Sequence, residues 1–73
     1  MPKLLIPDKL ARGLLPTVKP LKTWVGYGNG GPCDGCGQPV TATDLEYELE
    51  FAGERIIRLH KHCFAIWNAA TGN

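Results

Sequence analysis

The chain has 73 residues, of which 44% are hydrophobic and 21% charged, and its formal net charge at pH 7 is +1. A chain of this length forms one domain and buries only about 60% of the surface that it exposes when unfolded, so a metal, disulfides or a partner commonly adds stability. No apolar run approaches the roughly 20 residues of a membrane-spanning helix, and Pro7 interrupts the N-terminal apolar run too early for a signal peptide. We therefore expect a cytoplasmic protein that does not enter a membrane.

Charged residues are distributed unevenly along the chain. Residues 1–25 hold five basic side chains against one acidic one, and residues 26–50 hold five acidic side chains and no basic one. Residues 51–73 are again basic, with three basic side chains against one acidic one. Segments of this kind usually form solvated faces that pair with one another, and a basic arm that seeks an anionic partner is the alternative.

The first part of the chain, residues 1–25, reads as an N-terminal arm because four prolines divide it into short pieces. The run DKLARGLL predicts a short helix over about residues 8–15, with Asp8 as its N-cap and leucines along one side. The next piece, VKPLKTWV, reads as extended and carries Trp24. The arm either packs back as a lid or binds a partner, and residues 26–73 form the folded domain.

The segment GYGNGGP at residues 26–32 is rich in glycine. A phosphate-binding loop requires a helix directly after the glycines, whose N–H groups face the phosphate. Here Pro32 and a pair of cysteines follow instead. The segment therefore predicts a flexible turn with a positive φ at one or more glycines.

The clearest secondary structure is a β-hairpin. Apolar and acidic residues alternate in DLEYELEF at residues 44–51, which predicts a strand with one buried and one exposed face. RIIRLH at residues 55–60 predicts the second strand, after a three-residue loop with a positive φ at Gly53. Matching the two apolar faces sets three cross-strand pairs: Leu49 with Ile57, Tyr47 with Leu59, and Glu48 with Arg58. The apolar spacing in HCFAIWNAATGN then predicts a helix over about residues 61–70.

The cysteines and histidines follow the spacing of a zinc site. Cys33 and Cys36 are separated by two residues, His60 and Cys63 also by two, and 23 residues lie between the pairs. The predicted hairpin runs out and back between the pairs, so we expect them to meet. Four ligands of this type form a closed, tetrahedral, structural Zn²⁺ site, and we expect one ion per chain.

Other interpretations of these residues remain. His62 is an alternative to His60 as the fourth ligand, although the paired spacing favours His60. A redox disulfide between Cys33 and Cys36, with Cys63 as a buried thiol, is less favoured because the surrounding prolines and glycines are typical of a knuckle. A catalytic zinc keeps an open coordination position, whereas four ligands fill this one, so we expect no enzymatic activity.

The pattern from residue 33 to about residue 67, C-x2-C-x23-H-x2-C-F, resembles the first zinc-binding half of a LIM domain. More broadly it resembles treble-clef zinc fingers and small uncharacterised bacterial zinc-finger proteins. A LIM domain continues with cysteines for a second zinc, where this chain has Ile66 and Ala69. The resemblance therefore implies a small, zinc-stabilised α+β half-module with one metal, built from a knuckle, a hairpin and a C-terminal helix.

We expect the domain to act as a protein-interaction or regulatory module, because its apolar groups exceed what one small core needs. The candidate binding residues are Trp24, Ile56, Arg12 and Lys22. A nucleic-acid-binding zinc finger is the first alternative, with the basic side chains of the arm around Trp24, but the acidic row of the hairpin opposes it. A switch in which oxidation of the cysteines releases the metal is the second. The oligomeric state stays open.

Overall fold

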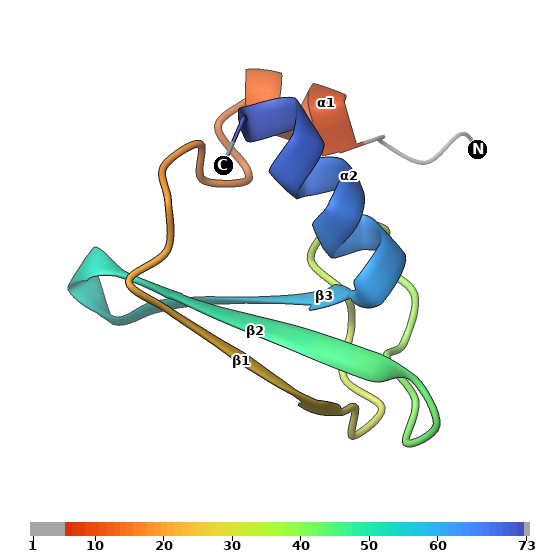
Figure 1. Ribbon diagram of the computed structural model, residues 1–73. Helices are drawn as coiled ribbons and strands as arrows, with labels where there is room; N and C mark the ends of the chain where they lie inside the picture. The colour runs from red at the N-terminus through yellow and green to blue at the C-terminus, as the bar shows by residue number, and fades with distance from the viewer. Residues whose placement is uncertain (1–5, 73) are drawn as a thin grey trace.

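The computed structural model describes residues 6–72, and residues 1–5 and 73 lie outside the description. The elements in chain order are α1 (Ile6–Ala11), β1 (Lys22–Tyr27), β2 (Leu45–Phe51), the 3₁₀ turn η1 (Ala52–Glu54), β3 (Arg55–His60) and α2 (Lys61–Thr71). The strands form one antiparallel sheet in the order β1-β2-β3. The helix α2 packs over one face of this sheet, and α1 lies beside α2 (Figure 1). Neither helix within residues 6–72 is long and apolar enough to cross a bilayer.

The predicted hairpin is confirmed in position and in register. β2 and β3 pair antiparallel, with Leu49 opposite Ile57 and Glu48 opposite Arg58. Gly53 in the connecting turn has a φ of 77°, as the three-residue loop requires. The apolar face of the hairpin lies under α2, which begins at Lys61 as predicted and ends one residue later than expected.

A third strand, β1, completes the sheet beside β2. Its residues pair with β2 from Lys22 opposite Glu50 to Tyr27 opposite Leu45. Gly26 and Tyr27 therefore belong to a strand, and their prediction as part of a flexible turn was wrong. β1 also runs across the expected boundary between residues 25 and 26, so the end of the arm is part of the sheet.

The predicted bounds of the first helix, residues 8–15, were also wrong. α1 begins before Asp8, which lies in its first turn, and ends at Ala11. Gly13 adopts a φ of 73°, and its N–H donates to the Leu10 carbonyl. The Leu14 N–H donates to the Lys9 carbonyl at 2.8 Å, which completes a Schellman C-cap. The glycine therefore ends the helix at Ala11, four residues or about one turn before the end that the leucine pattern suggested.

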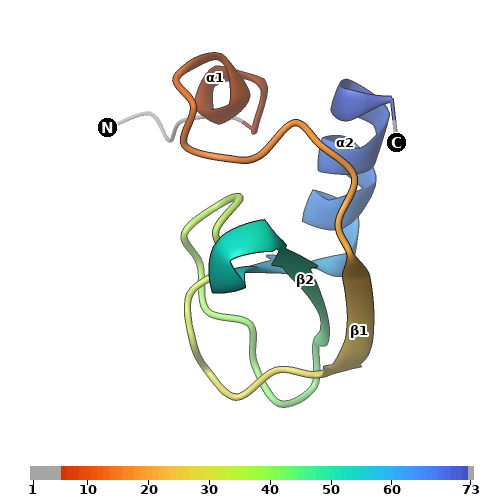
Figure 2. The same ribbon diagram turned by 90° about the vertical axis from the view of Figure 1, so that its left-hand side faces the viewer.

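The arm is part of the core. Among residues 6–72, ten hydrophobic residues are buried in one cluster: Ile6, Leu15, Cys33, Val40, Leu49, Phe51, Ile57, Leu59, Cys63 and Trp67. The Trp67 indole N–H donates to the Pro16 carbonyl at 2.8 Å, so α2 holds the segment that follows α1. Figure 2 shows this segment running from α1 to β1. Residues 6–16 therefore pack as a lid on the domain.

The glycine-rich loop approaches the chain that follows the cysteines. A Cβ at Gly28 would overlap the backbone carbonyls of Val40 and Thr41. The Gly30 N–H donates to the Val40 carbonyl, and the Val40 N–H donates to the Gly31 carbonyl, both at 2.8 Å. Gly30 has a φ of 90°, as expected for a turn. The glycines thus permit close packing of two backbone segments that flank the cysteine pair.

Candidate metal centre

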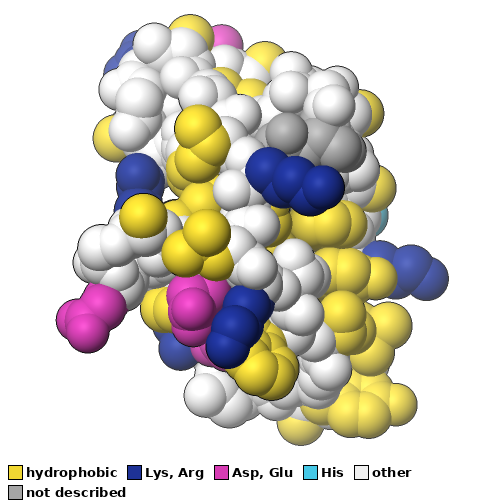
Figure 3. Space-filling model, turned by 60° about the vertical axis from the view of Figure 1, so that its left-hand side comes forward, with side chains coloured by type: hydrophobic (Ala, Val, Ile, Leu, Met, Phe, Trp, Pro, Cys, Tyr) yellow, Lys and Arg dark blue, Asp and Glu magenta, His cyan; other side chains and the backbone are white. Residues whose placement is uncertain are grey.

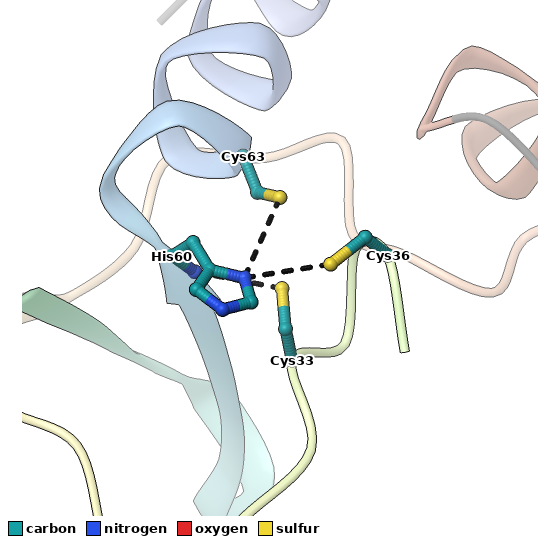
Figure 4. Close-up of side chains that lie close together, drawn as sticks. All are labelled: Cys33, Cys36, His60 and Cys63. Atoms are coloured by element: carbon teal, nitrogen blue, oxygen red, sulfur yellow. Dashed lines mark hydrogen bonds between the residues drawn. The ribbon is translucent and has the colours of Figure 1, made fainter. Parts of the chain in front are cut away.

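The structure brings the predicted ligands together at one end of the sheet (Figure 4). Cys33 and Cys36 come from the knuckle, His60 from the end of β3 and Cys63 from the first turn of α2. One donor atom of each, three sulfurs and one imidazole nitrogen, lies within 4.8 Å of all the others. This group could hold one metal ion. All three cysteines are free, so a Cys33–Cys36 disulfide does not form part of the structure.

Backbone hydrogen bonds shape the knuckle around Cys33. The Cys33 N–H donates to the Gln38 carbonyl, and the Gly37 N–H donates to the Cys33 carbonyl, both at 2.8 Å. Gly37 has a φ of 81°, which a glycine adopts without strain. The Gly35 N–H points to the Cys33 sulfur at 3.3 Å. These bonds turn the chain tightly enough to present two sulfurs on the same side.

Asp34 attaches the knuckle to β3, a role that the sequence analysis missed. Its N–H donates to the Arg58 carbonyl at 2.8 Å, and its carboxylate accepts from the Arg58 N–H at 2.8 Å. The His60 N–H adds a bond to the Cys33 sulfur at 3.4 Å. An aspartate in a turn commonly bonds a backbone N–H, but the sequence gives no signal that this N–H lies on a strand 24 residues away.

The ring of His60 is oriented for metal binding. Its Nε2 lies 2.9 Å from the Pro39 carbonyl, and because a carbonyl only accepts, Nε2 carries the proton. Nδ1 is then an unprotonated acceptor, 3.4 Å from the Cys36 sulfur and 3.9 Å from the Cys63 sulfur. Metal-binding histidines typically donate their second ring N–H in this way. Burial lowers the pKa of His60, but the Pro39 carbonyl and the Cys33 sulfur raise it above its usual value.

His62 lies outside the group of four. Its side chain is exposed, its ring stacks on that of His60 with 5.7 Å between ring centroids, and its Nε2 lies 3.6 Å from the Cys63 sulfur. It can therefore contact one sulfur from the solvent side. The geometry favours His60 as the fourth donor, in agreement with the spacing.

The sulfurs have opposite tendencies to ionise. Burial raises the pKa of Cys33, but N–H groups of Cys36, His60 and Gly35 outweigh this effect and lower the pKa to about 7. Burial and the neighbouring Cys33 sulfur raise the pKa of Cys63 to about 12. Adjacent thiolates repel each other, so all three sulfurs become thiolates together only around a cation. Three thiolates and one imidazole are a donor set typical of tetrahedral zinc.

The predicted binding residues do not form a single site. Trp24 and Lys22 lie together on β1, with the Lys22 ammonium 5.7 Å from the centroid of the Trp24 ring. Ile56 is half-buried on β3, two strands away from Trp24 in the sheet order. Arg12 is exposed just after α1.

The chain matches no protein-family model, and comparisons with curated proteins and with solved structures find no match. The fold and the site thus define a small α+β protein with a three-stranded antiparallel sheet, a C-terminal helix and a cluster that could hold one metal ion.

Proposed function

We propose that the protein is a single-zinc, treble-clef-like module that serves protein interaction and has no enzymatic activity. Cys33, Cys36, His60 and Cys63 would bind one Zn²⁺. The observation that carries this proposal is the set of four donor atoms within 4.8 Å of one another, with the Nδ1 acceptor of His60 directed at the sulfurs.

The donor set supports a structural rather than a catalytic metal. Four protein ligands complete a tetrahedral zinc shell, whereas catalytic sites keep one position for water or substrate. A zinc here would join the knuckle, β3 and α2, three parts of the chain that share a small core, with ten buried hydrophobic residues among those that the structure describes. Zinc binding contributes about 10–16 kcal/mol to the folding of zinc-finger peptides, as much as the roughly 5–15 kcal/mol that stabilises typical domains. We therefore expect the metal-free chain to be largely unfolded.

The test is a measurement of metal content followed by metal removal. Native mass spectrometry should find one zinc per chain, and Co²⁺ in its place should give the visible spectrum of a tetrahedral thiolate site. A chelator should then abolish the secondary structure in circular dichroism and shift the emission of Trp67, which is buried, to longer wavelength. Purified protein without metal, or a fold unchanged by the chelator, would refute the structural role.

Exposed apolar side chains support the interaction role. Six of the seven large hydrophobic residues that are most exposed among those described fall between residues 14 and 27: Leu14, Val18, Leu21, Trp24, Val25 and Tyr27. Figure 3 shows apolar side chains gathered at the lower right of its face, the side on which Figure 2 shows β1. Exposed apolar side chains that are concentrated in one segment in this way are typical of interaction sites in small soluble proteins.

Nucleic-acid binding and a redox switch rank below this role. The cationic Lys22 and the ring of Trp24 lie beside the acidic row of β2, with Glu50 opposite Lys22 and Glu48 opposite Trp24, and these carboxylates repel phosphate. Phosphate binding would weaken steeply with added salt, which distinguishes it from an apolar contact.

The lowered pKa of Cys33 favours a reactive thiolate, but its side chain is 1% exposed, so an oxidant has little access. Retention of zinc under mild peroxide would exclude the switch.

A further inference from the structure

The two edges of the sheet differ sharply. At the β3 edge the knuckle covers the backbone, because Asp34 bonds both the N–H and the carbonyl of Arg58, and Cys33 accepts from the His60 N–H. At the other edge, no strand within residues 6–72 lies beside the outer side of β1. Figures 1 and 2 both show β1 at the border of the sheet. All six residues of β1 are exposed, so this edge is open.

The backbone of β1 offers regular hydrogen-bonding groups at this edge. The Gly28 N–H donates to the Asp44 carbonyl, which fixes the alternation: even-numbered residues of β1 bond β2. In an antiparallel sheet the N–H and carbonyl groups of Thr23, Val25 and Tyr27 then point to the outer side. Natural edge strands are usually protected by charges, prolines or bulges. β1 pairs with β2 without a bulge and has only Lys22, at its first position, as a charged residue.

Gly26 gives an independent indication that a second chain approaches. Its φ is not positive, and a Cβ built on it meets no described atom within 4 Å. The folded single chain therefore does not require a glycine at this position, although a glycine inside a strand weakens it. A glycine in this setting often marks the close approach of another chain or ligand.

We propose that β1 pairs antiparallel with β1 of a second copy of this chain, about a two-fold axis at Val25. This inference rests on the proposed interaction role of β1 and names its partner. The pairing joins the two three-stranded sheets into one continuous sheet. Val25 then faces Val25 of the second copy, and Thr23 faces its Tyr27, so the outward backbone groups bond each other in register.

The side chains of the opposite face fit the same register. Trp24 falls opposite Gly26 of the second copy, where the missing side chain leaves room for an indole ring. Lys22 falls opposite Gly28 of the second copy, and Gly28 is bonded to Asp44 on β2. Because Gly28 has no side chain, the Lys22 ammonium can extend over it toward the Asp44 carboxylate of the second copy. Both the shape and the charge of β1 are self-complementary in this arrangement.

The contact is short, so we expect a weak and reversible dimer. Six paired residues span about 20 Å, and the strand supplies less than the roughly 800 Å² per partner of a standard stable interface. Sedimentation equilibrium of the zinc-loaded full chain, from micromolar to millimolar concentration, should show a monomer–dimer equilibrium. The emission of Trp24, which is 52% exposed, should shift to shorter wavelength as the dimer forms.

Two variants test the register, and a third controls for surface hydrophobicity. Val25→Lys places two ammonium groups face to face and should weaken the dimer at least about tenfold. Gly26→Thr meets nothing in the single chain but occupies the space assigned to the Trp24 ring, so it should weaken the dimer while circular dichroism and zinc content stay unchanged. Val18→Lys removes a similarly exposed apolar side chain outside β1 and should leave the dimer as it is.

Three results would overturn the inference. The zinc-loaded protein could be a monomer at every concentration, the dimer could be equally strong in Val25→Lys and Gly26→Thr, or Val18→Lys could weaken it as much as they do. Zinc content is measured in the same samples. A zinc-loaded monomer would therefore refute the second copy as the partner and leave the metal site standing, whereas absent zinc would refute the proposed function instead.

Discussion

Replacing Asp34 with alanine tests whether the knuckle is held in place by its bond to β3. The substitution removes the carboxylate that accepts the Arg58 N–H at 2.8 Å and leaves the bond from the Asp34 N–H to the Arg58 carbonyl intact. Hydrogen bonds to charged groups contribute about 1.5–3 kcal/mol. Because Asp34 is exposed, water can replace part of this bond, and we expect a loss of about 1–2 kcal/mol in the free energy of unfolding.

The loss should appear both in stability and in zinc affinity. For a domain of this size each kcal/mol corresponds to about 4–8 °C in Tm. Folding and metal binding are coupled, so competition with a chromophoric chelator should show zinc affinity lowered by about 5- to 30-fold. Asp34→Asn keeps a side-chain acceptor and should recover part of the loss.

A matched control separates the backbone bond from surface charge. Glu48→Ala removes a carboxylate that pairs with the Arg58 guanidinium at 3.0 Å in an exposed setting, where ion pairs contribute about 0–1 kcal/mol. Asp34→Ala should therefore be clearly less stable than Glu48→Ala in urea unfolding of the zinc-loaded protein. Equal effects of the two substitutions would refute the assignment of Asp34 as the attachment of the knuckle.

Three further predictions concern the site itself. A methyl group at Gly35 would lie 3.1–3.2 Å from side-chain atoms of Ile6, Leu59 and Cys63. Gly35→Ala should therefore lower the free energy of unfolding, measured by urea titration, by about 1–3 kcal/mol. An unchanged free energy of unfolding would contradict this packing. His60→Gln removes a proposed ligand and should lower zinc affinity at least about tenfold, since even the loss of a residue that only orients a ligand can have an effect of this size. His62→Gln should leave zinc affinity unchanged. The opposite result for the two variants would assign the fourth ligand to His62. Zinc binds thiolates, and in the largely unfolded metal-free chain the cysteine thiols keep an ordinary pKa of about 8.5, so below that pH they must release protons when zinc binds. Zinc affinity should therefore fall at least about tenfold for each unit by which pH decreases, and a chelator competition independent of pH would contradict it.

The hairpin and α2 could be predicted because their signals are local. Strict alternation along β2 and a glycine at the turn fix the register between neighbouring segments, and the structure confirms the pairing of Leu49 with Ile57. β1 could not be recognised in the same way, because all its residues are exposed and its side chains do not alternate in polarity. Its position depends on pairing with residues that lie 18 to 28 positions further along the chain, from Tyr27 with Leu45 to Lys22 with Glu50.

The candidate site, too, could be predicted only in part from the sequence. Spacing alone identified the group of Cys33, Cys36, His60 and Cys63 that the structure brings together. The groups that orient these donors were not predictable, since the Asp34 carboxylate and the Pro39 carbonyl act through contacts 24 and 21 residues away in the sequence. Such contacts exist only once the chain has folded.

The knuckle also determines which edges of the sheet are open. With the knuckle in place, Asp34 and Cys33 occupy the backbone groups of Arg58 and His60 at the β3 edge, and β1 is the edge left for pairing. Pairing of one edge about a two-fold axis closes the assembly at a dimer.

Loss of zinc would release the knuckle, and in metal-free chains that still hold the sheet while most of the population unfolds, the β3 edge would be open as well. A chain with two open edges can add copies at both ends, and such open-ended pairing leads to aggregates rather than to a closed dimer. We therefore expect chelation to raise light scattering at concentrations where the zinc-loaded protein stays clear. Lys substitution of Val25 should slow this aggregation, since it blocks one of the two edges, but should not abolish it. Light scattering that does not rise on chelation would show that the knuckle does not protect the sheet in this way.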